Sequence, residues 1–344
     1  MIYYPVLIPT LNRANHLKRC LESLARNTGA QNTEIYISVD FPPHEKYKSG
    51  YEQVKDLLSY MDFSVFQKVH IFFQETNLGP SGNSVFLRSQ IEEKYDAYIF
   101  SEDDNEFAPN FLEYINKGLE FFKDDSRVLA VCGSRDTNWI TNGKNAIFTK
   151  LFAAYGVGIW IDKRNREVAL GNTIVVPPKP YSPKKMYELY KKNSYLFCAY
   201  IIFILSTDTG LFWKDEKNLN WCDTVHSIYM HFTDSVCIAP AISKSRTWGN
   251  DGSGVNMQKI DIDTEKEIPL DQDLYFEYNN FEGLEFIDEN YKIGNLYLSH
   301  SWKLKFTAVC FYIILLIFGK KRKGAVKFIK KLQKIIKKIK TLKK

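Results

Sequence analysis

The feature that most constrains this chain is the regular alternation of apolar runs with amphipathic segments over its first 110 residues. The apolar runs are rich in β-branched and aromatic residues, which is typical of buried strands. They read YYPVLIPT, EIYISVD, KVHIFFQE and AYIFSEDD. Strands that alternate with helices require right-handed crossovers, so we predict an α/β fold with a mostly parallel sheet covered by helices on both faces.

Three amphipathic segments between these runs are predicted to be helices, at residues 13–27, 51–61 and 80–94. In the first of them Leu17, Leu21 and Leu24 recur at helical spacing and define one apolar face. The third is opened by the sequence Pro-Ser-Gly, and proline is well tolerated in a first helical turn. These helices are expected to cover the sheet.

Polar and acidic residues stand where three of the predicted strands end, namely Thr10, Asp40 and the acidic triplet Glu102, Asp103 and Asp104. Open α/β sheets bind ligands beyond the carboxyl ends of their strands. Three crowded carboxylates repel one another unless a positive charge lies among them. A solvated turn is the simpler explanation of such a triplet. We favour a site for Mg²⁺ or Mn²⁺ completed by the phosphate oxygens of a nucleoside diphosphate.

Several motifs, in this order along the chain, resemble the N-acetylglucosaminyltransferase I family of inverting glycosyltransferases with the GT-A fold. They are PVLIPTLNRANHLKRCLESL, EIYISVD, YIFSEDDNEFAPNF, CGSRDTNWITNGKN, LFAAYGVGIW and VCIAPAISKSRTWGNDGSGVN. The likeness runs from about residue 5 to residue 256. It implies a GT-A (Rossmann-like) fold, a nucleotide-sugar donor and a bound Mn²⁺ ion, for which Mg²⁺ is the alternative.

The resemblance also implies individual roles at the predicted ligand edge. We expect nucleotide contacts from Thr10, Arg13, Asp40 and Asp103, a donor-sugar contact from Glu102, and the metal ligand in Asp104. Arg13 would lie near the diphosphate and Asp40 would accept a hydrogen bond from uracil. Without the resemblance, Arg13 would be interpreted as a solvated helix start and Asp40 as a cap at the end of a strand.

An inverting transfer needs a general base that removes a proton from the acceptor hydroxyl. In the resembling family this base is an aspartate directly after a tryptophan, but here Cys222 follows Trp221. A thiol is a poor base for a sugar hydroxyl, so we assign the role to Asp223. Asp208 and His226 are the alternatives, and a lone histidine is more often structural than catalytic.

A glycine-rich loop, SRTWGNDGSGVN, lies near residue 250. Glycines allow mobility and a close approach of backbone to ligand. We therefore predict a lid over the bound donor that includes Arg246, Trp248 and Gly249 and excludes water. An ordinary surface loop is the alternative interpretation.

The formal charge of +6 hides a strong asymmetry, because residues 319–344 hold thirteen Lys and Arg and no acid. The rest of the chain therefore has a net charge of −7. An uncharged run of thirteen residues, 306–318, precedes this tail and is too short to span a bilayer, which takes roughly twenty. The tail itself has apolar residues at helical spacing, and it predicts a basic amphipathic helix on an anionic membrane surface. Binding to nucleic acid or docking on the protein are the alternatives, and we expect no nucleic-acid partner.

We divide the chain into a catalytic domain at 1–256, an acidic and aromatic extension at 257–303, and a membrane-associating tail at 304–344. In the domain, residues 1–110 would bind the nucleotide sugar and 111–256 the acceptor. The start of the chain lacks the features of a signal peptide. We therefore expect an enzyme at the cytoplasmic face of a bacterial membrane that extends a lipid-linked glycan of a surface polysaccharide, such as lipopolysaccharide or capsule.

Two other functions stay open. The chain could be a catalytically inactive nucleotide-sugar-binding membrane protein, because Cys222 departs from the expected base. It could also be a sugar-1-phosphate nucleotidyltransferase, although that class usually begins with a glycine-rich basic loop that PTLNRANHLKR lacks.

Overall fold

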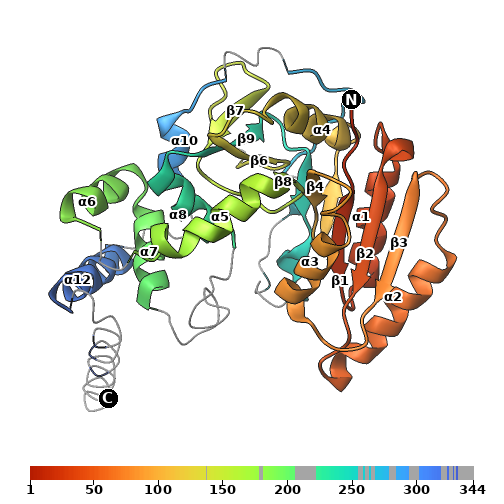
Figure 1. The fold of residues 1–344 in the computed structure, drawn as a ribbon, viewed down its shortest axis with the longest axis horizontal. Coiled ribbons are helices and arrows are strands. Elements are labelled where there is room, and N and C mark those ends of the chain that lie inside the picture. The colour runs from red at the N-terminus through yellow and green to blue at the C-terminus, as the bar shows by residue number, and fades with distance from the viewer. Residues whose placement is uncertain are drawn as a thin grey trace. The chain divides into compact units, whose positions relative to one another are not determined.

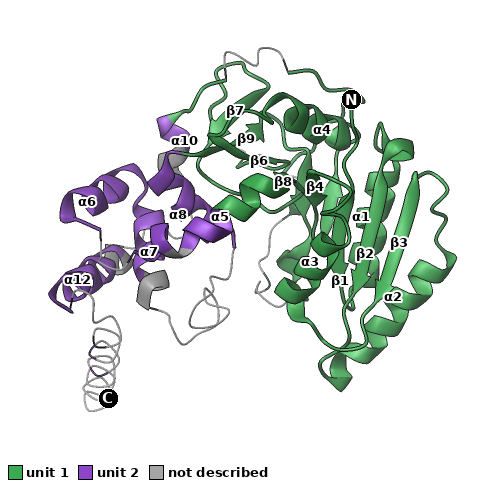
Figure 2. Cartoon of the chain, in the orientation of Figure 1, with its two compact units in different colours: residues 1–166, 235–287 green, residues 167–234, 288–344 purple. Residues whose placement is uncertain are grey.

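A computed structural model describes most of the chain (Figure 1). The described residues are 1–136, 138–177, 181–205, 222–254, 259, 263–264, 268–278, 284–293, 302–318, 324, 328 and 331. Contacts divide the chain into two compact units, coloured separately in Figure 2. Unit 1 comprises residues 1–166 and 235–287, and unit 2 comprises 167–234 and 288–344. Unit 1 thus takes in residues 268–278 of the predicted extension.

Unit 1 is built around an eight-stranded sheet with the order β3-β2-β1-β4-β8-β6-β9-β7. Its strands are β1 (Val6–Thr10), β2 (Glu34–Val39), β3 (Lys68–Phe73), β4 (Ala97–Phe100), β6 (Val128–Cys132), β7 (Ala146–Thr149), β8 (Val157–Trp160) and β9 (Val236–Pro240). The first four pair in parallel, as do β6 and β9, whereas β8 and β7 run antiparallel to their neighbours. A separate two-stranded ribbon pairs β5 (Asn105–Phe107) with β10 (Ser245–Thr247). The predicted mostly parallel sheet is confirmed.

The sheet is covered by helices because its strands carry apolar side chains on both faces. The main core joins Val6 and Ile8 of β1 to apolar residues of α1 (Ala14–Ala25), α2 (Lys48–Tyr60) and α4 (Phe111–Phe121). Helix α3 (Gly79–Ser89) contacts β1 and β2 and contributes the buried Leu87. Side chains alternate along a strand, so Leu7, between Val6 and Ile8, faces the other way.

The three predicted helices are present, their ends differ from the predicted ones, and the largest difference is at α3. Helix α3 ends at Ser89, five residues before the predicted end at Lys94. Beyond it the amide of Gln90 bonds to the carbonyl of Leu87, and that of Ile91 to the carbonyl of Arg88. These bonds span three residues instead of four, so the chain tightens into turns and the α-helix stops.

Unit 2 is helical in its described parts. It contains the end of α5 (Ile161–Ile174), α6 (Pro183–Lys192), α7 (Ser194–Leu205), α8 (Asp223–Thr233), α10 (Asp288–Ile293) and α12 (Trp302–Phe318). Within the described residues, every helix falls short of the length and apolar character that a membrane crossing requires. The predicted amphipathic helix of the tail, 319–344, falls outside the described residues except at 324, 328 and 331.

Candidate active site

The carboxyl ends of β1, β2 and β4 meet at one edge of the sheet. Thr10 is the last residue of β1, and the amide of Asp40, just after β2, donates a 2.9 Å hydrogen bond to its carbonyl. Strand β4 pairs in parallel with β1 and ends at Phe100, two residues before the acidic triplet. The predicted gathering of these residues at one edge is therefore present in the structure.

Arg13 supplies the positive charge among the acids. Its Nη1 donates a 2.7 Å hydrogen bond to Oδ2 of Asp104, and its Nη2 forms an ion pair with Oδ1 of Asp103. The other oxygen of Asp103 accepts a 2.7 Å hydrogen bond from the hydroxyl of Thr10. Glu102, directly before this pair, is half-buried. The predicted nucleotide residues Thr10, Arg13 and Asp103 thus form one contiguous cluster with Asp104.

The charged side chains of this cluster are largely buried. The side chain of Asp103 is 4% exposed and that of Asp104 is 7% exposed, while the side chain of Arg13 is 16% exposed. Burial opposes a charge on Arg13, but the two carboxylates outweigh it and raise the pKa of the guanidinium. Arg13 therefore carries a full charge at every physiological pH, and it neutralises one of the two acids.

The far side of Asp104 is closed by the chain after β10. Its Oδ1 accepts a 3.3 Å hydrogen bond from the hydroxyl of Thr247, and its carbonyl accepts a 2.8 Å bond from the amide of Trp248. A Cβ atom added to Gly249 would lie 2.3 Å from Oδ2 of Asp104. Glycine is thus required here by close approach, not by mobility.

The acids match the chemistry of Mn²⁺ or Mg²⁺ only in part. Carboxylate oxygens are suitable ligands, and such ions commonly use one or two carboxylates together with phosphate oxygens. However, the described residues include no group of three His, Cys, Asp or Glu side chains that could hold a metal ion. Oδ2 of Asp104 is also bonded to Arg13. The residues therefore fit a metal held by one carboxylate and a bound diphosphate, not a site formed by the protein alone.

Asp40 has a structural role that the sequence left open. Its Oδ1 accepts hydrogen bonds from the amides of Phe41 and Leu78, at 2.9 and 2.8 Å. Its Oδ2 accepts from the amide of Gly79 and the side chain of Asn77, at 2.9 and 3.0 Å. The carboxylate thus fastens the end of β2 to the start of α3, as the strand-cap interpretation predicts. A contact with uracil, which stays a prediction, would have to replace one of these bonds.

Two of the predicted lid residues, Arg246 and Gly249, belong to regular structure, and Trp248 lies between them. Arg246 lies in β10, which pairs antiparallel with β5, and its Nε donates a 2.8 Å hydrogen bond to Glu106. The indole of Trp248 donates a 2.7 Å bond to the same carboxylate oxygen, and the guanidinium of Arg19 lies 4.1 Å from the tryptophan ring centre. Arg246 and Trp248 are therefore anchored to Glu106, and their role in a lid over the donor stays a prediction.

Glu106 is the residue that sequence reasoning missed. It lies on β5, two positions beyond Asp104. An acid two positions after the triplet was the only available signal, and it did not distinguish an anchor from a solvated side chain. The structure reveals its role because β10, 140 residues away in sequence, brings Arg246 and Trp248 to it.

The predicted base Asp223 and the alternative His226 belong to unit 2. Asp223 is the first residue of α8, and Cys222 caps that helix. Burial raises the pKa of the Cys222 thiol, so it stays protonated and is unsuited to act as a base. His226 is buried, with its Nδ1 2.7 Å from the buried Glu167, a pairing that supports a structural role. Asp208 and Trp221 lie outside the described residues.

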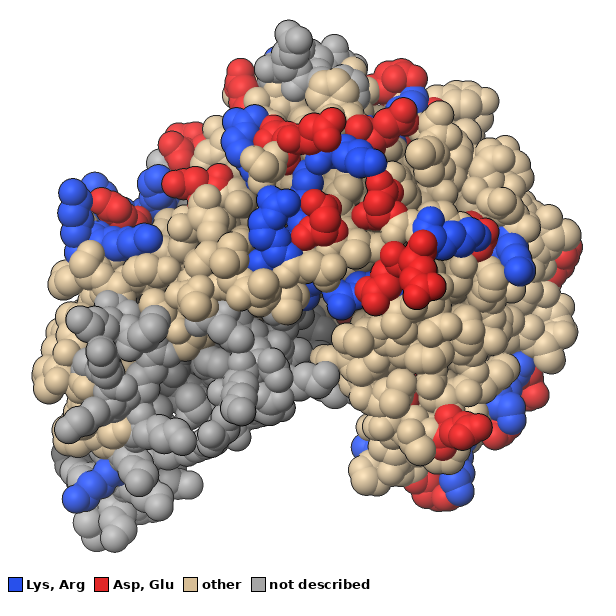
Figure 3. Space-filling model, viewed as in Figure 1, with Lys and Arg blue, Asp and Glu red and all other residues tan. Residues whose placement is uncertain are grey.

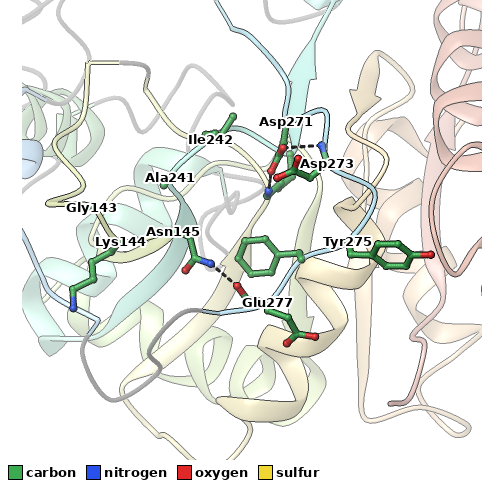
Figure 4. Close-up of a pocket in the computed structure, with 11 residues that line it drawn as sticks. Gly143, Lys144, Asn145, Ala241, Ile242, Asp271, Asp273, Tyr275 and Glu277 are labelled. Atoms are coloured by element: carbon green, nitrogen blue, oxygen red, sulfur yellow. Dashed lines mark hydrogen bonds and ion pairs between the residues drawn. The ribbon is translucent and has the colours of Figure 1, made fainter.

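A separate open pocket in unit 1 contains none of the predicted site residues (Figure 4). The side chain of Asn145 donates a hydrogen bond to the carbonyl of Glu277 at its rim, and Lys244 pairs with Asp271. The aromatic ring of Phe276 lies 4.6 Å from the Lys244 ammonium. Lys244 and Asp271 neutralise each other, and the other charged residues of the lining are Lys144, Asp273 and Glu277.

Comparison with known families decides the identity of the fold. Residues 6–212 match the family model described as glycosyl transferase family 2. This chain belongs to that family. Its α/β sheet is the GT-A fold, as predicted, and the prediction of a glycosyltransferase is confirmed at the level of the family. None of the curated proteins searched matches the chain.

Solved structures give weaker likenesses. One is S. aureus TarS 1-349 in complex with UDP-GlcNAc, with 13% identity, a TM-score of 0.35 and 48% coverage of each chain. Another is the mannosyltransferase PcManGT from Pyrobaculum calidifontis in complex with GDP-Man and Mn²⁺, with 12% identity, a TM-score of 0.36 and coverage of 67% of this chain and 69% of that one. The chain thus spans about half of the first of these. At such scores the two likenesses carry no argument of their own.

Proposed function

We propose that this protein transfers a sugar, with inversion, from a nucleotide sugar to a glycan acceptor. The observation that carries the proposal is the buried cluster of Thr10, Arg13, Asp103 and Asp104 at the ligand edge of a family 2 sheet. A nucleoside diphosphate brings negative charge and many acceptor oxygens. Arg13 is a charged donor that can reach such oxygens, and Asp103 is an acceptor fixed by Thr10 that can receive a ribose hydroxyl.

Asp104 is the residue we assign to hold Mn²⁺ or Mg²⁺, together with phosphate oxygens of the donor. When bound, such an ion neutralises charge on the departing diphosphate. The chain's own contribution is positioning, because the carboxylate of Asp104 bonds to Thr247 and Arg13 and its backbone carbonyl bonds to the amide of Trp248. Glu102 is assigned to the donor sugar. Family membership favours this activity over a sugar-1-phosphate nucleotidyltransferase.

Asp223 is the general base in this proposal. Cys222 carries a protonated thiol, which is unsuited to the role, and His226 is buried and paired with Glu167, which supports a structural role. Asp223 is the first residue of α8, so the helical backbone fixes the position of its Cα atom. The base removes the proton of the acceptor hydroxyl while the bond between sugar and phosphate breaks.

We further propose that the donor is a UDP-sugar, that the acceptor is a lipid-linked glycan, and that the basic tail brings the enzyme to the cytoplasmic face of a bacterial membrane. The support is electrostatic. Apart from residues 319–344 the chain has a net charge of −7, which an anionic surface repels, so the thirteen basic residues of the tail are needed for attraction.

The test is a thermal-shift screen of UDP-, GDP- and dTDP-sugars with and without Mn²⁺, followed by turnover with the sugar that binds. A ligand that binds only the folded state raises the unfolding midpoint. We expect a UDP-sugar to raise it. Asp104→Asn should abolish the part of the shift that depends on metal.

Asp223→Asn should keep donor binding and lower kcat by about 10²- to 10⁴-fold, the usual contribution of a general base. His226→Gln is the matched comparison and should leave kcat largely unchanged if the protein folds. Donor binding without turnover in the wild type, with every lipid-linked acceptor tried, would favour an inactive nucleotide-sugar-binding protein. Absence of any nucleotide binding would refute the proposal.

A further inference from the structure

Helix α12 is largely apolar on all sides from Phe306 to its end at Phe318. From Phe306 to Phe318 it contains no charged residue. A helix without a polar face is normally surrounded by protein or lipid, because every side would otherwise expose apolar surface to water. The burial of its individual side chains therefore shows which side of the helix packs against protein and which side is exposed.

One side of α12 packs within unit 2. Ala308, Tyr312 and Leu315 are buried, and the helix contacts α7. The hydroxyl of Tyr312 donates a 2.7 Å hydrogen bond to the carbonyl of Tyr181, and its ring meets that of Phe197 edge-on. These contacts fix the rotation of α12 about its own axis.

The opposite side of α12 is exposed. The outward residues share a large apolar side chain, and they are Phe306 (65% exposed), Val309 (38%), Ile313 (50%), Leu316 (38%) and Ile317 (75%). At about 100° per residue they fall on one continuous stripe facing away from Ala308, Tyr312 and Leu315. Single exposed apolar residues are common, but a contiguous apolar surface usually marks an interaction site.

The charge of the adjoining sequence indicates what covers this stripe. Residues 319–344 follow α12 directly and hold thirteen Lys and Arg and no acid. A second copy of the chain would bring two such tails together, and their repulsion opposes a dimer at this surface. In the view of Figure 3 the described surface mixes acidic and basic side chains.

We propose that the outward stripe of α12, from Phe306 to Ile317, inserts into the interfacial region of an anionic bilayer. The arrangement has both parts of an interfacial anchor, with apolar side chains for the acyl boundary and adjoining lysines for the anionic headgroups. This inference rests on the proposed recruitment of the tail to a membrane and adds an apolar contact to it. It also explains why α12 is too short to cross a bilayer yet apolar all round.

The two parts of the anchor respond differently to salt. Attraction between lysines and headgroups is screened as the ionic strength rises, with a Debye length of about 4 Å at roughly 0.5 M NaCl. Burial of the stripe is not screened. The test is co-sedimentation of the full-length protein with vesicles of phosphatidylcholine and about one third phosphatidylglycerol, at low salt and at roughly 0.5 M NaCl.

We expect the double variant Ile313→Asn/Ile317→Asn to bind at least tenfold more weakly than the wild type at high salt, because burying one such side chain is worth about a factor of ten. Deleting residues 319–344 should weaken binding mainly at low salt. Val85→Asn, at a residue on α3 that is 52% exposed, is the control and should bind as the wild type does.

Each outcome discriminates. Equal binding of the double variant and the wild type at high salt would overturn this inference and leave recruitment by the tail intact. A wild type that binds no vesicles at any salt would overturn both. A dimer in sedimentation velocity that the double variant loses would show that a second copy covers the stripe. The thermal shift by nucleotide sugars reads donor binding separately, and it should be the same in every variant.

Discussion

The guanidinium group of Arg13 lies between the carboxylates of Asp103 and Asp104, which are ninety and ninety-one residues away in sequence. The acidic cluster at the end of β4 therefore has a resident counter-ion that comes from the chain itself. This relationship makes the site stable without a bound ligand, and it sets a competition, because a divalent cation at Asp104 needs the oxygen that Arg13 now holds.

Replacement of Arg13 tests whether the arginine and a divalent cation compete for the carboxylate of Asp104. We expect Arg13→Met to lower the free energy of unfolding by about 3 kcal/mol, because it leaves buried carboxylates without their partner. The same variant should bind Mn²⁺ more tightly than the wild type in the absence of nucleotide. Chemical denaturation measures the first effect, and electron paramagnetic resonance of Mn²⁺ measures the second.

The control for Arg13 is Arg88→Met, which removes an arginine from an exposed ion pair with Glu92 and should cost less than about 1 kcal/mol. If Arg13→Met and the wild type bind Mn²⁺ equally in the absence of nucleotide, the arginine does not compete for Asp104.

Asp40→Asn separates the two interpretations of Asp40. The substitution replaces one of two oxygens that together accept four hydrogen bonds, so we expect the free energy of unfolding to fall by about 2–3 kcal/mol. As a strand cap, Asp40 should affect the affinity for UDP by less than about tenfold, or 1.4 kcal/mol. Denaturation and calorimetry give the two numbers. A large loss of affinity with unchanged stability would instead support the contact with uracil.

Glu106→Gln should loosen the segment that covers Asp104. Glu106 accepts charge-assisted bonds from Arg246 and Trp248, and weakening them should lower local stability by about 1–3 kcal/mol. We expect amide hydrogens of residues 245–254 to exchange roughly ten- to hundredfold faster, while those of β2 keep their rates. Hydrogen-exchange mass spectrometry measures this. Glu92→Gln, at an exposed acid, is the control, and equal exchange in both variants would argue against the anchor.

Glu34 should make the stability of unit 1 depend on pH in the acidic range. Burial raises its pKa, but hydrogen bonds from Lys94, His70 and Tyr36 outweigh burial and lower the pKa to about 2. Because the folded pKa lies below the unfolded value of about 4.3, this stabilisation of about 3 kcal/mol is present above pH 4.3 and is lost as the pH falls toward 2.

For Glu34→Gln we therefore expect a free energy of unfolding that depends less on pH between about 4.3 and 2 than that of the wild type. Denaturant titrations at a series of pH values provide the comparison. The two proteins should differ most near neutral pH and converge in acid. A constant difference across the range would mean that Glu34 does not titrate as described.

Much of the fold followed from local pattern. The apolar runs of β1 to β4 can be recognised within a few consecutive residues. The helical spacing of Leu17, Leu21 and Leu24 can also be read from one short segment. The end of α3 at Ser89 did not follow, since the pattern to Lys94 is equally compatible with turns. The position of the antiparallel strand β8 between β4 and β6 could not be predicted either, because strand order depends on contacts between distant segments.

The sequence alone determined the class of the fold, the edge where polar residues gather and the contrast between an acidic body and a basic tail, because each is encoded in consecutive residues. Only the tertiary structure decided that Arg13 neutralises Asp103 and Asp104, that Asp40 caps a strand, and that Glu106 anchors Arg246 and Trp248. The physical reason is that a charge or a hydrogen bond acts over a few ångströms in space. The partner at that distance is chosen by how the whole chain packs.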